Sequence, residues 1–452
     1  MPGRAPATLG GLLTLAWPSV VSRSSQVVVG ISDAVMVAHL GEGALAATTA
    51  GALNAFALFI LPMGIVFIVS SFSSQLLGKG DLAGARRYGY YGLAVAAATQ
   101  VLGVLAIPAA AWAIGLLDYG PEVAGPMTGY LAMRLWSGGG AIGLEALGNY
   151  YGGLGNTRLP MRASVAAMAM NVLLNWILID GRLGAPEMGV EGAALASVLS
   201  TSLAFLGLLG VFLADGRRTG PVLARLRGGE MLRMLRFGIP SGLNWFFEFL
   251  AYVFFVNVVV GGLGTTSLAA LMAVLQLNSV SFMPAFGLAS AGAILVGQSI
   301  GAGDRDGVPR IVRLTFAAAG SWQGLVGLAY LLVPGLLFAP FARDPASAEG
   351  LLAAGTRLLA LSAAWQLFDA AVASLAESLR AAGDTAFTLW ARVVVAWVLF
   401  VPGSWITVRV LDGGDVAAVS WLVLYLAALS LALLLRFRSG AWRRIELVEP
   451  SA

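Results

Sequence analysis

Long apolar segments alternate with short polar or Gly/Pro-containing breaks along almost the whole chain. Most segments reach the length of about 20 residues that a helix needs to cross a bilayer. They are too long and continuous for the strands of a membrane barrel, and a helix satisfies its backbone hydrogen bonds within one segment. We therefore predict an all-α polytopic membrane protein with twelve transmembrane helices, at about 12–38, 45–77, 88–117, 127–153, 160–180, 189–214, 234–261, 267–300, 309–339, 353–380, 384–410 and 415–436.

Composition supports this class. Hydrophobic residues make up 58% of the 452 residues and charged residues only 11%, against about 25% in soluble domains. The chain has no cysteine, so it forms neither disulfides nor thiolate metal sites. The single histidine, His39, cannot build a metal site by itself, and we expect an interfacial polar residue. The net charge of +4 does not indicate nucleic-acid binding, because the arginines lie in loops between spans.

The basic residues segregate to one side when the loops are numbered alternately. The other side holds only Arg182, Arg343 and Arg409. Since positive residues stay in the cytoplasm, both termini are expected there, in a multi-pass protein of the inner or plasma membrane. The first apolar segment is too long for a signal-peptide core, and we expect a retained span.

The two halves of the chain share a series of markers in the same order. Pro18-Ser19 corresponds to Pro240-Ser241, and Gln75 with Gly80-Asp81 corresponds to Gln298 with Gly303-Asp304; Pro62 matches Pro284, and Gly155-Asn156-Thr157 matches Gly383-Asp384-Thr385. Six spans in each half predict parallel repeats, with sites near the bilayer midplane. The predicted domains are an N-lobe (1–214, spans 1–6), a cytoplasmic linker (215–233), a C-lobe (234–436, spans 7–12) and a cytoplasmic tail (437–452).

Two carboxylates, Glu248 and Asp369, stand near the middle of apolar segments of the second half. A charge at that depth costs about 2.5–3.5 kcal/mol on insertion scales and usually marks an ion or substrate path. At about 1.5 Å per helical residue, both lie roughly 18 Å from the same membrane edge. Together they could share a proton or bind Na⁺. The alternative is that arginines such as Arg357 and Arg392 neutralise them, although we expect both arginines near span ends.

A second polar set lies in the first half. Asp33 in the first span is joined by Asn171 and Asn175, which share a helix face in the fifth span, and by Ser197 in the sixth. These residues could supply oxygen ligands for a cation or hydrogen bonds to a protonated acid. They could equally hold helices together, as polar residues do in membranes.

Further candidates surround these acids. Trp245, Phe246 and Phe249 flank Glu248, and Gln26 holds the matching position in the first half. Such aromatics suit an organic cation through apolar contact and cation–π attraction, so we predict substrate contacts for this group. By contrast, Glu377 is expected to pair locally with Arg380, and the glycine-rich stretch beside Glu145 indicates close helix packing.

These residues resemble the multidrug and toxic compound extrusion (MATE) family, NorM-like branch, over nearly the whole chain. The resemblance is carried by Pro18, by Asp33 in Gly30-Ile-Ser-Asp-Ala-Val-Met36, by Phe246-Phe247-Glu248, by Phe368-Asp369-Ala370, by Ser378-Leu-Arg380 with Gly383-Asp384, and by Gln75 and Gln298 before their Gly-x-Gly-Asp turns. It implies two six-helix lobes in a V-shaped fold that works by alternating access. It also implies cation-driven export of amphipathic, mostly cationic organic compounds.

In NorM-like members the acids matching Glu248 and Asp369 form the coupling-cation site, commonly associated with sodium. In other branches the acid matching Asp33 and its fifth-span partners handle protons or sodium. This chain has Asn175 where those branches often have Asp, which favours the NorM-like branch. Na⁺ and H⁺ both stay open as coupling ions. No other cofactor, no nucleic-acid partner and a monomer in the bilayer are expected.

Three other functions agree less well with the sequence. A lipid-linked precursor flippase needs a basic cavity, and the spans offer chiefly Arg23 and Arg134. An intramembrane enzyme is disfavoured because no H-E-x-x-H, G-x-S-x-G or P-loop motif is present. A passive channel is disfavoured by the two-lobe repeat.

Overall fold

The chain is helical throughout the residues that the structure describes. The computed structural model describes residues 6–116, 119–219, 226–341 and 348–448, and within these ranges it contains helices but no strand. The all-α prediction is confirmed. Arg343, the middle of the predicted linker and the end of the predicted tail lie outside the described residues.

Contacts divide the chain into two compact units. Unit 1 contains Val21–Gly242, and unit 2 contains Ala5–Val20 and Leu243–Ala452. Two helices therefore have residues in both units, namely α1 (Leu9–Val37) and α9 (Gly228–Phe254). In unit 2 the residues after the last long helix pack back onto the unit, because Trp442 belongs to its hydrophobic core.

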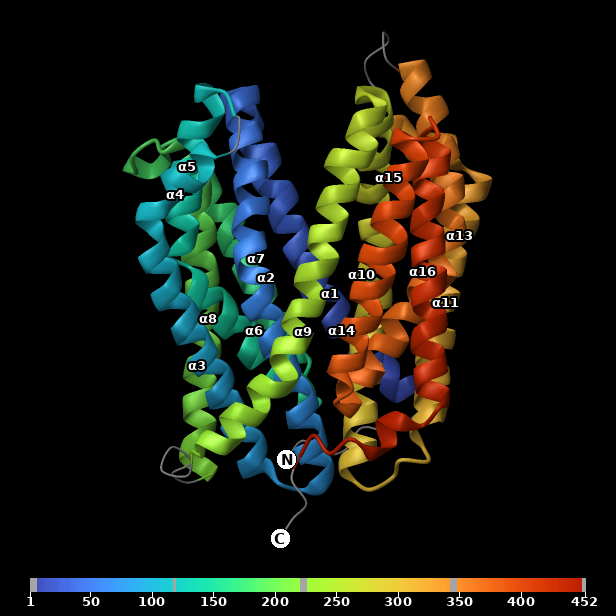
Figure 1. Ribbon diagram of the computed structural model, residues 1–452. Coiled ribbons are helices and arrows are strands. Elements are labelled where there is room, and N and C mark those ends of the chain that lie inside the picture. The colour runs from blue at the N-terminus through green and yellow to red at the C-terminus, as the bar shows by residue number, and fades with distance from the viewer. Residues whose placement is uncertain (1–5, 117–118, 220–225, 342–347, 449–452) are drawn as a thin grey trace. The chain divides into compact units, whose positions relative to one another are not determined.

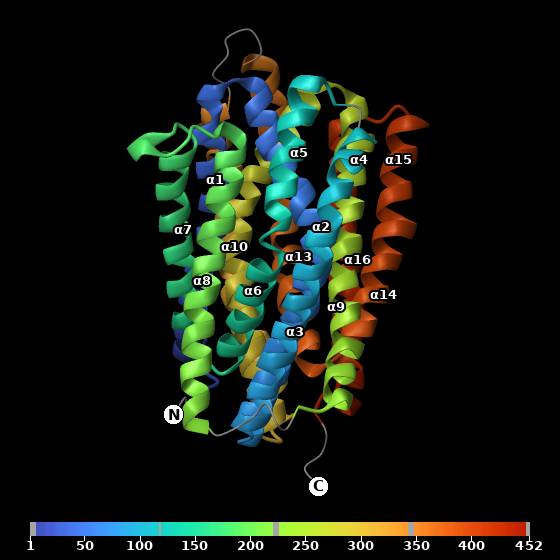
Figure 2. The same cartoon turned by 90° about the vertical axis from the view of Figure 1, so that its left-hand side faces the viewer.

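Unit 1 is a helical bundle in which the axes of the long helices are roughly aligned (Figures 1 and 2). Besides parts of α1 and α9, it consists of α2 (Glu42–Lys79), α3 (Leu82–Ala106), α4 (Ala110–Gly115), α5 (Pro121–Leu135), α6 (Gly138–Gly153), α7 (Arg158–Leu178) and α8 (Gly189–Thr219).

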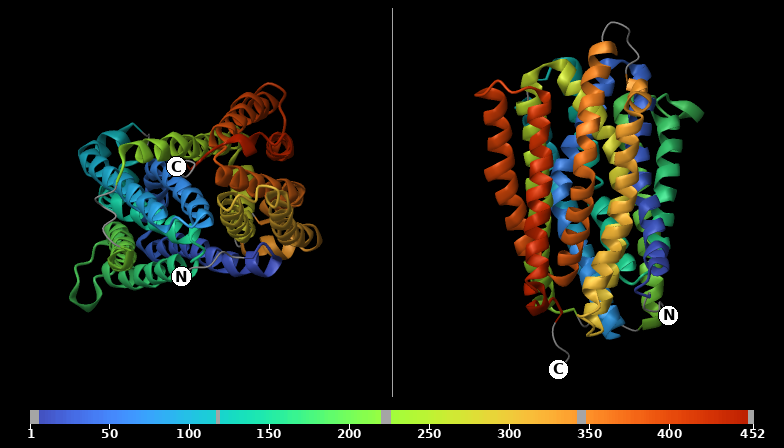
Figure 3. Two further views of the ribbon diagram at one scale, coloured as in Figure 1. Left: turned by 90° about the horizontal axis from the view of Figure 1, so that it is seen from below. Right: turned by 90° about the vertical axis from the view of Figure 1, so that its right-hand side faces the viewer.

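Unit 2 is a second bundle, in which α10 packs against α11 and α13 (Figure 3, right, yellow to orange). Its further elements are the π-helical turn η5 (Phe255–Val260), α10 (Thr265–Gly301), α11 (Val308–Leu332), α12 (Pro334–Phe338), α13 (Ala348–Ala382), α14 (Thr385–Val394), the π-helical turn η8 (Val395–Phe400), α15 (Val401–Arg409) and α16 (Asp415–Arg438).

The fourth predicted span is broken into α5 and α6 by a turn at residues 136–137. The break precedes three consecutive glycines, each of which costs a helix interior about 1 kcal/mol relative to alanine. The freed Gly139 N–H donates to Gln100 Oε1 on α3 at 2.8 Å, which satisfies one donor at the start of α6.

The glycines of α6 serve close packing, as predicted. A Cβ on Gly139 would lie 2.8 Å from Gln100 Cβ, and one on Gly153 would lie 2.6 Å from the Ser70 carbonyl oxygen of α2. A Cβ on Gly143 would overlap the Phe205 ring of α8. Helix α6 therefore sits tightly among α2, α3 and α8.

The ninth predicted span is bent by 94° between α11 and α12. The bend falls at Val333, directly before Pro334, whose ring and missing N–H prevent the helix from continuing. Among the described residues ten helices are long and apolar enough to cross a membrane, or eleven when this bent pair counts as one span. The predicted fourth span is not among them, because α5 and α6 are each shorter than 18 residues.

The repeat predicted from sequence has matching local geometry in the two units. Gly80 (φ 83°) directly follows α2, and Gly303 (φ 82°) lies two residues after the end of α10. Both have a left-handed conformation that glycine adopts without strain. In both units an aspartate follows this glycine, and its side chain accepts a hydrogen bond from a backbone N–H three residues later. Asp81 Oδ1 accepts from the Gly84 N–H at 2.7 Å, and Asp304 Oδ1 accepts from the Gly307 N–H at 2.9 Å.

Candidate functional site

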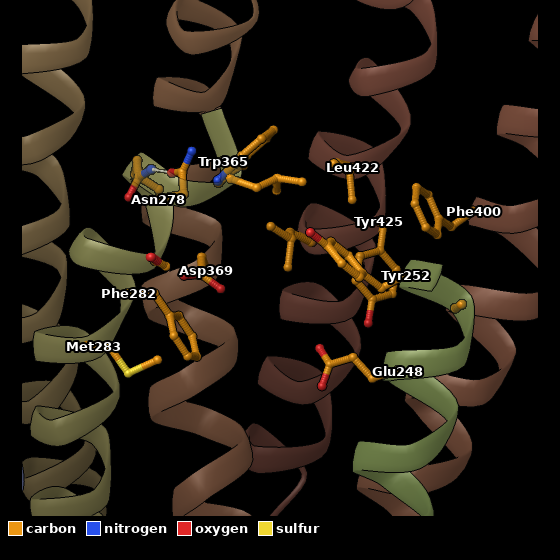
Figure 4. A pocket seen from close by; sticks show the side chains of 15 residues that line it. Glu248, Tyr252, Asn278, Phe282, Met283, Trp365, Asp369, Phe400, Leu422 and Tyr425 are labelled. Carbon is orange, nitrogen blue, oxygen red and sulfur yellow. Dashed lines mark hydrogen bonds between the residues drawn. The ribbon is translucent and has the colours of Figure 1, made fainter. Parts of the chain in front are cut away.

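A cavity of about 330 Å³ lies within unit 2, and both predicted acids line it (Figure 4). Glu248 enters from α9 and Asp369 from α13, so the structure brings together two residues that are 121 positions apart in the sequence. The rest of the wall is mostly apolar and aromatic, from α9, α10, α13, η8 and α16: Ala251, Tyr252, Leu275, Asn278, Ser279, Phe282, Met283, Trp365, Gln366, Phe400, Leu422, Tyr425 and Leu426.

Asp369 is held by an uncharged partner. Gln323 Nε2 on α11 donates to Asp369 Oδ2 at 2.8 Å, while Gln323 Oε1 is buried without a hydrogen bond. In the described part of the chain no arginine or lysine forms an ion pair with Asp369. The half-buried carboxylate thus faces the cavity without a fixed counter-charge.

Glu248 differs, because its carboxylate forms an ion pair with Arg392 of α14. The expectation that Arg392 lies near a span end and points outward is wrong: its side chain is only 8% exposed. Arg357 does lie outward, 62% exposed, and pairs with Asp415 at 3.7 Å. The alternative of neutralisation by arginine therefore holds for Glu248 and fails for Asp369.

A small polar network forms another part of the cavity wall. Gln366 Nε2 donates to Asn278 Oδ1, drawn as a dashed line in Figure 4, and Ser281 Oγ donates to Gln366 Oε1 at 3.1 Å. Sequence reasoning missed Gln366 and Gln323. Both are polar residues inside apolar spans, and Gln366 lies one helical turn before Asp369, so the polarity of these positions was a usable signal.

The aromatic side chains of the cavity are not the predicted ones. They are Tyr252, Phe282, Trp365, Phe400 and Tyr425. Residues four apart share a helix face, so Tyr252 continues the face of Glu248, whereas Phe246 and Phe249 are rotated away. Trp245 packs edge-on against Phe286 at 5.7 Å, and Gln26 belongs to unit 1. Substrate contact by these four residues stays a prediction.

In unit 1 the predicted polar set comes together as a closed ring. Asn175 Nδ2 donates to Asp33 Oδ1 at 2.5 Å and to Asn171 Oδ1 at 3.3 Å. Asn171 Nδ2 donates to Ser197 Oγ at 3.1 Å, and Ser197 Oγ donates to Asp33 Oδ2 at 3.2 Å. All four residues are buried, and both carboxylate oxygens are hydrogen-bonded. The Asn175 Oδ1 atom is left without a partner.

The remaining acids in the spans are paired. Arg23 Nη2 donates to Glu145 Oε1 at 2.7 Å, and Arg23 also lies over the Phe67 ring at 5.2 Å. Glu377 pairs with Arg380 on the same helix, as predicted. Each unit thus contains an acid paired with an arginine from another helix, Glu145 with Arg23 and Glu248 with Arg392, and an acid held by amides.

Two acids and aromatic walls suit a monovalent cation or an amphipathic organic cation. Carboxylate oxygens are ligands for hard cations, and aromatic faces attract organic ones. In the described residues no group of three His, Cys, Asp or Glu side chains gathers, so the cavity offers two acids and no larger metal cluster. His39 pairs with Asp180 at 2.8 Å.

Known proteins provide an independent comparison. The MatE family profile matches residues 18–177 and 240–406. A probable multidrug resistance protein NorM from Rhizobium meliloti is 30% identical over 451 residues, covering 96% of this chain and 93% of that protein. A protein of the same name from Chromobacterium violaceum is 30% identical, covering 85% and 83%.

Solved structures agree in fold. An outward-facing multidrug resistance MATE family transporter of the MOP superfamily superimposes with a TM-score of 0.85 at 20% identity, covering 98% and 97% of the two chains. A MOP superfamily transporter from Pyrococcus furiosus, reported with a binding pocket of reverse polarity, gives 0.84 at 19% identity and covers 96% of both. Since the family profile spans both halves and NorM proteins align over nearly the full length, this chain is a NorM-like member of the MatE family, a multi-pass membrane transporter and not an enzyme.

Proposed function

We propose that the protein is an antiporter that exports amphipathic, mostly cationic organic compounds by alternating access and is driven by inward flow of Na⁺ or H⁺. The observation that carries this proposal is the unit 2 cavity, where aromatic walls surround Asp369 and Glu248. Its volume of about 330 Å³ falls at the lower end of small-molecule sites. The NorM relatives are named as probable multidrug resistance proteins, which agrees with this substrate class.

Competition for negative charge couples the two cations. A bound organic cation and a bound Na⁺ or H⁺ each weaken the other's binding, because both are attracted by the same negative charge of the cavity. Export of a cation against the membrane potential requires the inward flow of another, since each charge moved costs about 2.3 kcal/mol per 100 mV. We place both termini in the cytoplasm, consistent with the distribution of arginines.

The Asp33 ring in unit 1 is the alternative coupling site. Its carboxylate is buried and is held by amides and a hydroxyl, so a proton or ion binding there would disturb a closed network. If coupling occurs through Na⁺ in unit 2, replacing Asp369 should abolish efflux. If it occurs through a proton in unit 1, replacing Asp33 should abolish it instead.

The polarity of the sites favours cations over the pyrophosphate of a lipid-linked precursor. One structural neighbour is reported with a reversed pocket polarity, so the polarity must be argued from this chain's own residues. Acids line the unit 2 cavity, and Arg23, one of two arginines considered for an anion cradle, is neutralised by Glu145.

The experiment is drug efflux from proteoliposomes under a sodium gradient or a pH gradient, each imposed alone. Wild type is compared with Asp369→Asn, Asp33→Asn and, as a control distant from the cavity acids, Asp415→Asn. Sodium-driven efflux that disappears in Asp369→Asn supports unit 2 coupling, and pH-driven efflux that disappears only in Asp33→Asn moves coupling to unit 1. Absence of efflux from wild type under both gradients would overturn the antiporter proposal.

A further inference from the structure

Arg392 is a buried cation at the back of the cavity. It extends from α14 to the Glu248 carboxylate, is 8% exposed and does not line the cavity itself. Its Nε atom has no hydrogen-bond partner. Glu248, 35% exposed, is thus open to the cavity and also in contact with Arg392.

The surrounding packing holds this pair in place. Trp397 Nε1 of η8 donates to the carbonyl oxygen of Phe247, the residue before Glu248, at 3.3 Å. The Phe255 ring of η5 packs against the Phe400 ring of η8 with centroids 4.9 Å apart. The turn η8, which directly follows α14, is therefore joined to α9 and to η5 at two points. Both contacts use π-helical turns, which occur frequently at functional sites.

Counting formal charges gives the cavity one net negative charge when both acids are ionised. Glu248 and Asp369 contribute two negative charges, and Arg392 contributes one positive charge. Asp369 has only the neutral Gln323 as a partner. The cavity therefore neutralises only one of the two positive charges of a dication, through the Asp369 carboxylate.

We propose that Arg392 limits the charge of the ligand that the cavity accepts: it neutralises Glu248, so that Asp369 binds one positive charge and dications are rejected. Rejection by an unfavourable charge is a common way to achieve specificity. This inference rests on the proposed function and names a residue that sets its substrate class.

The test uses two fluorescent dyes, ethidium and propidium, which share a ring system but carry one and two positive charges. Their dissociation constants are measured on purified protein for wild type, Arg392→Gln and the control Arg357→Gln, whose exposed arginine lies away from the cavity. Because Coulomb attraction scales with ligand charge, Arg392→Gln should raise the ratio of propidium to ethidium affinity at least tenfold, or about 1.4 kcal/mol. Arg357→Gln should leave the ratio within about twofold of wild type by the same scaling.

The double variant Glu248→Gln/Arg392→Gln decides the question even if Arg392→Gln does not fold. It has no unpaired buried charge from this pair and returns the cavity to one negative charge, so it should show the wild-type ratio and bind ethidium within about threefold of wild type. Loss of ethidium binding in the double variant, or an unchanged ratio in folded Arg392→Gln, would overturn the inference alone. Wild-type protein that neither binds ethidium nor exports it would overturn the proposed function and this inference together.

Discussion

Replacing Glu248 with Gln should destabilise the protein because it leaves Arg392 buried without its carboxylate. Removing one partner of a fully buried ion pair costs about 3–5 kcal/mol, whereas exposed pairs are worth at most about 1 kcal/mol. Glu248 is 35% exposed and Arg392 only 8%, so this pair lies between these limits. We expect a loss of about 2–3 kcal/mol in the free energy of unfolding.

Thermal unfolding of purified protein in detergent measures this loss. At roughly 2–4 °C per kcal/mol for a unit of this size, the Tm of Glu248→Gln should fall by about 4–12 °C. The double variant Glu248→Gln/Arg392→Gln should recover most of the loss, because replacing both charges removes the uncompensated cation. A double-mutant cycle then gives the coupling between the two residues.

Asp415→Asn is the matched control, since it removes the partner of the exposed Arg357 in the same unit. Asp415 itself is 15% exposed, but the arginine that it leaves unpaired is 62% exposed and stays solvated, so the Tm should change by no more than about 2 °C. Equal Tm values for Glu248→Gln and Asp415→Asn, or a double variant less stable than Glu248→Gln, would refute the assignment of Arg392 as the fixed partner of Glu248.

Two further predictions concern the fold. Asp81→Ala removes the N-cap acceptor of α3, and Asp304→Ala removes the acceptor for the Gly307 N–H in the matching turn before α11. Each should lower the free energy of unfolding by about 1 kcal/mol, and a thermal melt in which only one of them loses stability would contradict the structural equivalence of the repeats. Gly153→Ala places a Cβ 2.6 Å from the Ser70 carbonyl oxygen and should lower the Tm. A Cβ at the neighbouring Gly152 has no atom within 4 Å, so Gly152→Ala should be neutral or stabilise the protein by up to about 1 kcal/mol. A lower Tm for Gly152→Ala than for Gly153→Ala would rule out the tight contact of α6 with α2.

Much of the fold was predictable because its signals are local. Most long apolar runs form one long helix each, and the Gly80-Asp81 and Gly303-Asp304 turns have matching geometry, since a left-handed glycine and an aspartate that accepts a nearby backbone hydrogen bond act within a few residues. Breaks at residues 136–137 and the 94° bend before Pro334 were not predicted, although glycine and proline mark both positions. Their effect depends on which neighbouring side chains can satisfy the freed backbone groups, as Gln100 does for Gly139.

The Asp33 ring was also predictable, because Asn171 and Asn175 are one turn apart and Asp33 is the one carboxylate within the first predicted span. The pairing of Glu248 with Arg392 was not. The two residues are 144 positions apart, and their meeting depends on how α9 and α14 are rotated about their axes. One residue along a helix turns a side chain by about 100°, so a small change of rotation would expose the arginine instead.

The sequence by itself thus determined that this is a helical membrane protein built from a repeated unit, because apolar length and turn residues act over short distances. It also determined which acids stand in the spans. Only the tertiary structure decided which of those acids carry a counter-charge: Glu248 and Glu145 contact arginines, while Asp369 and Asp33 contact amides. The physical reason is that the charge partner of a buried acid is chosen by helix rotation and packing across distant segments, which no local pattern encodes.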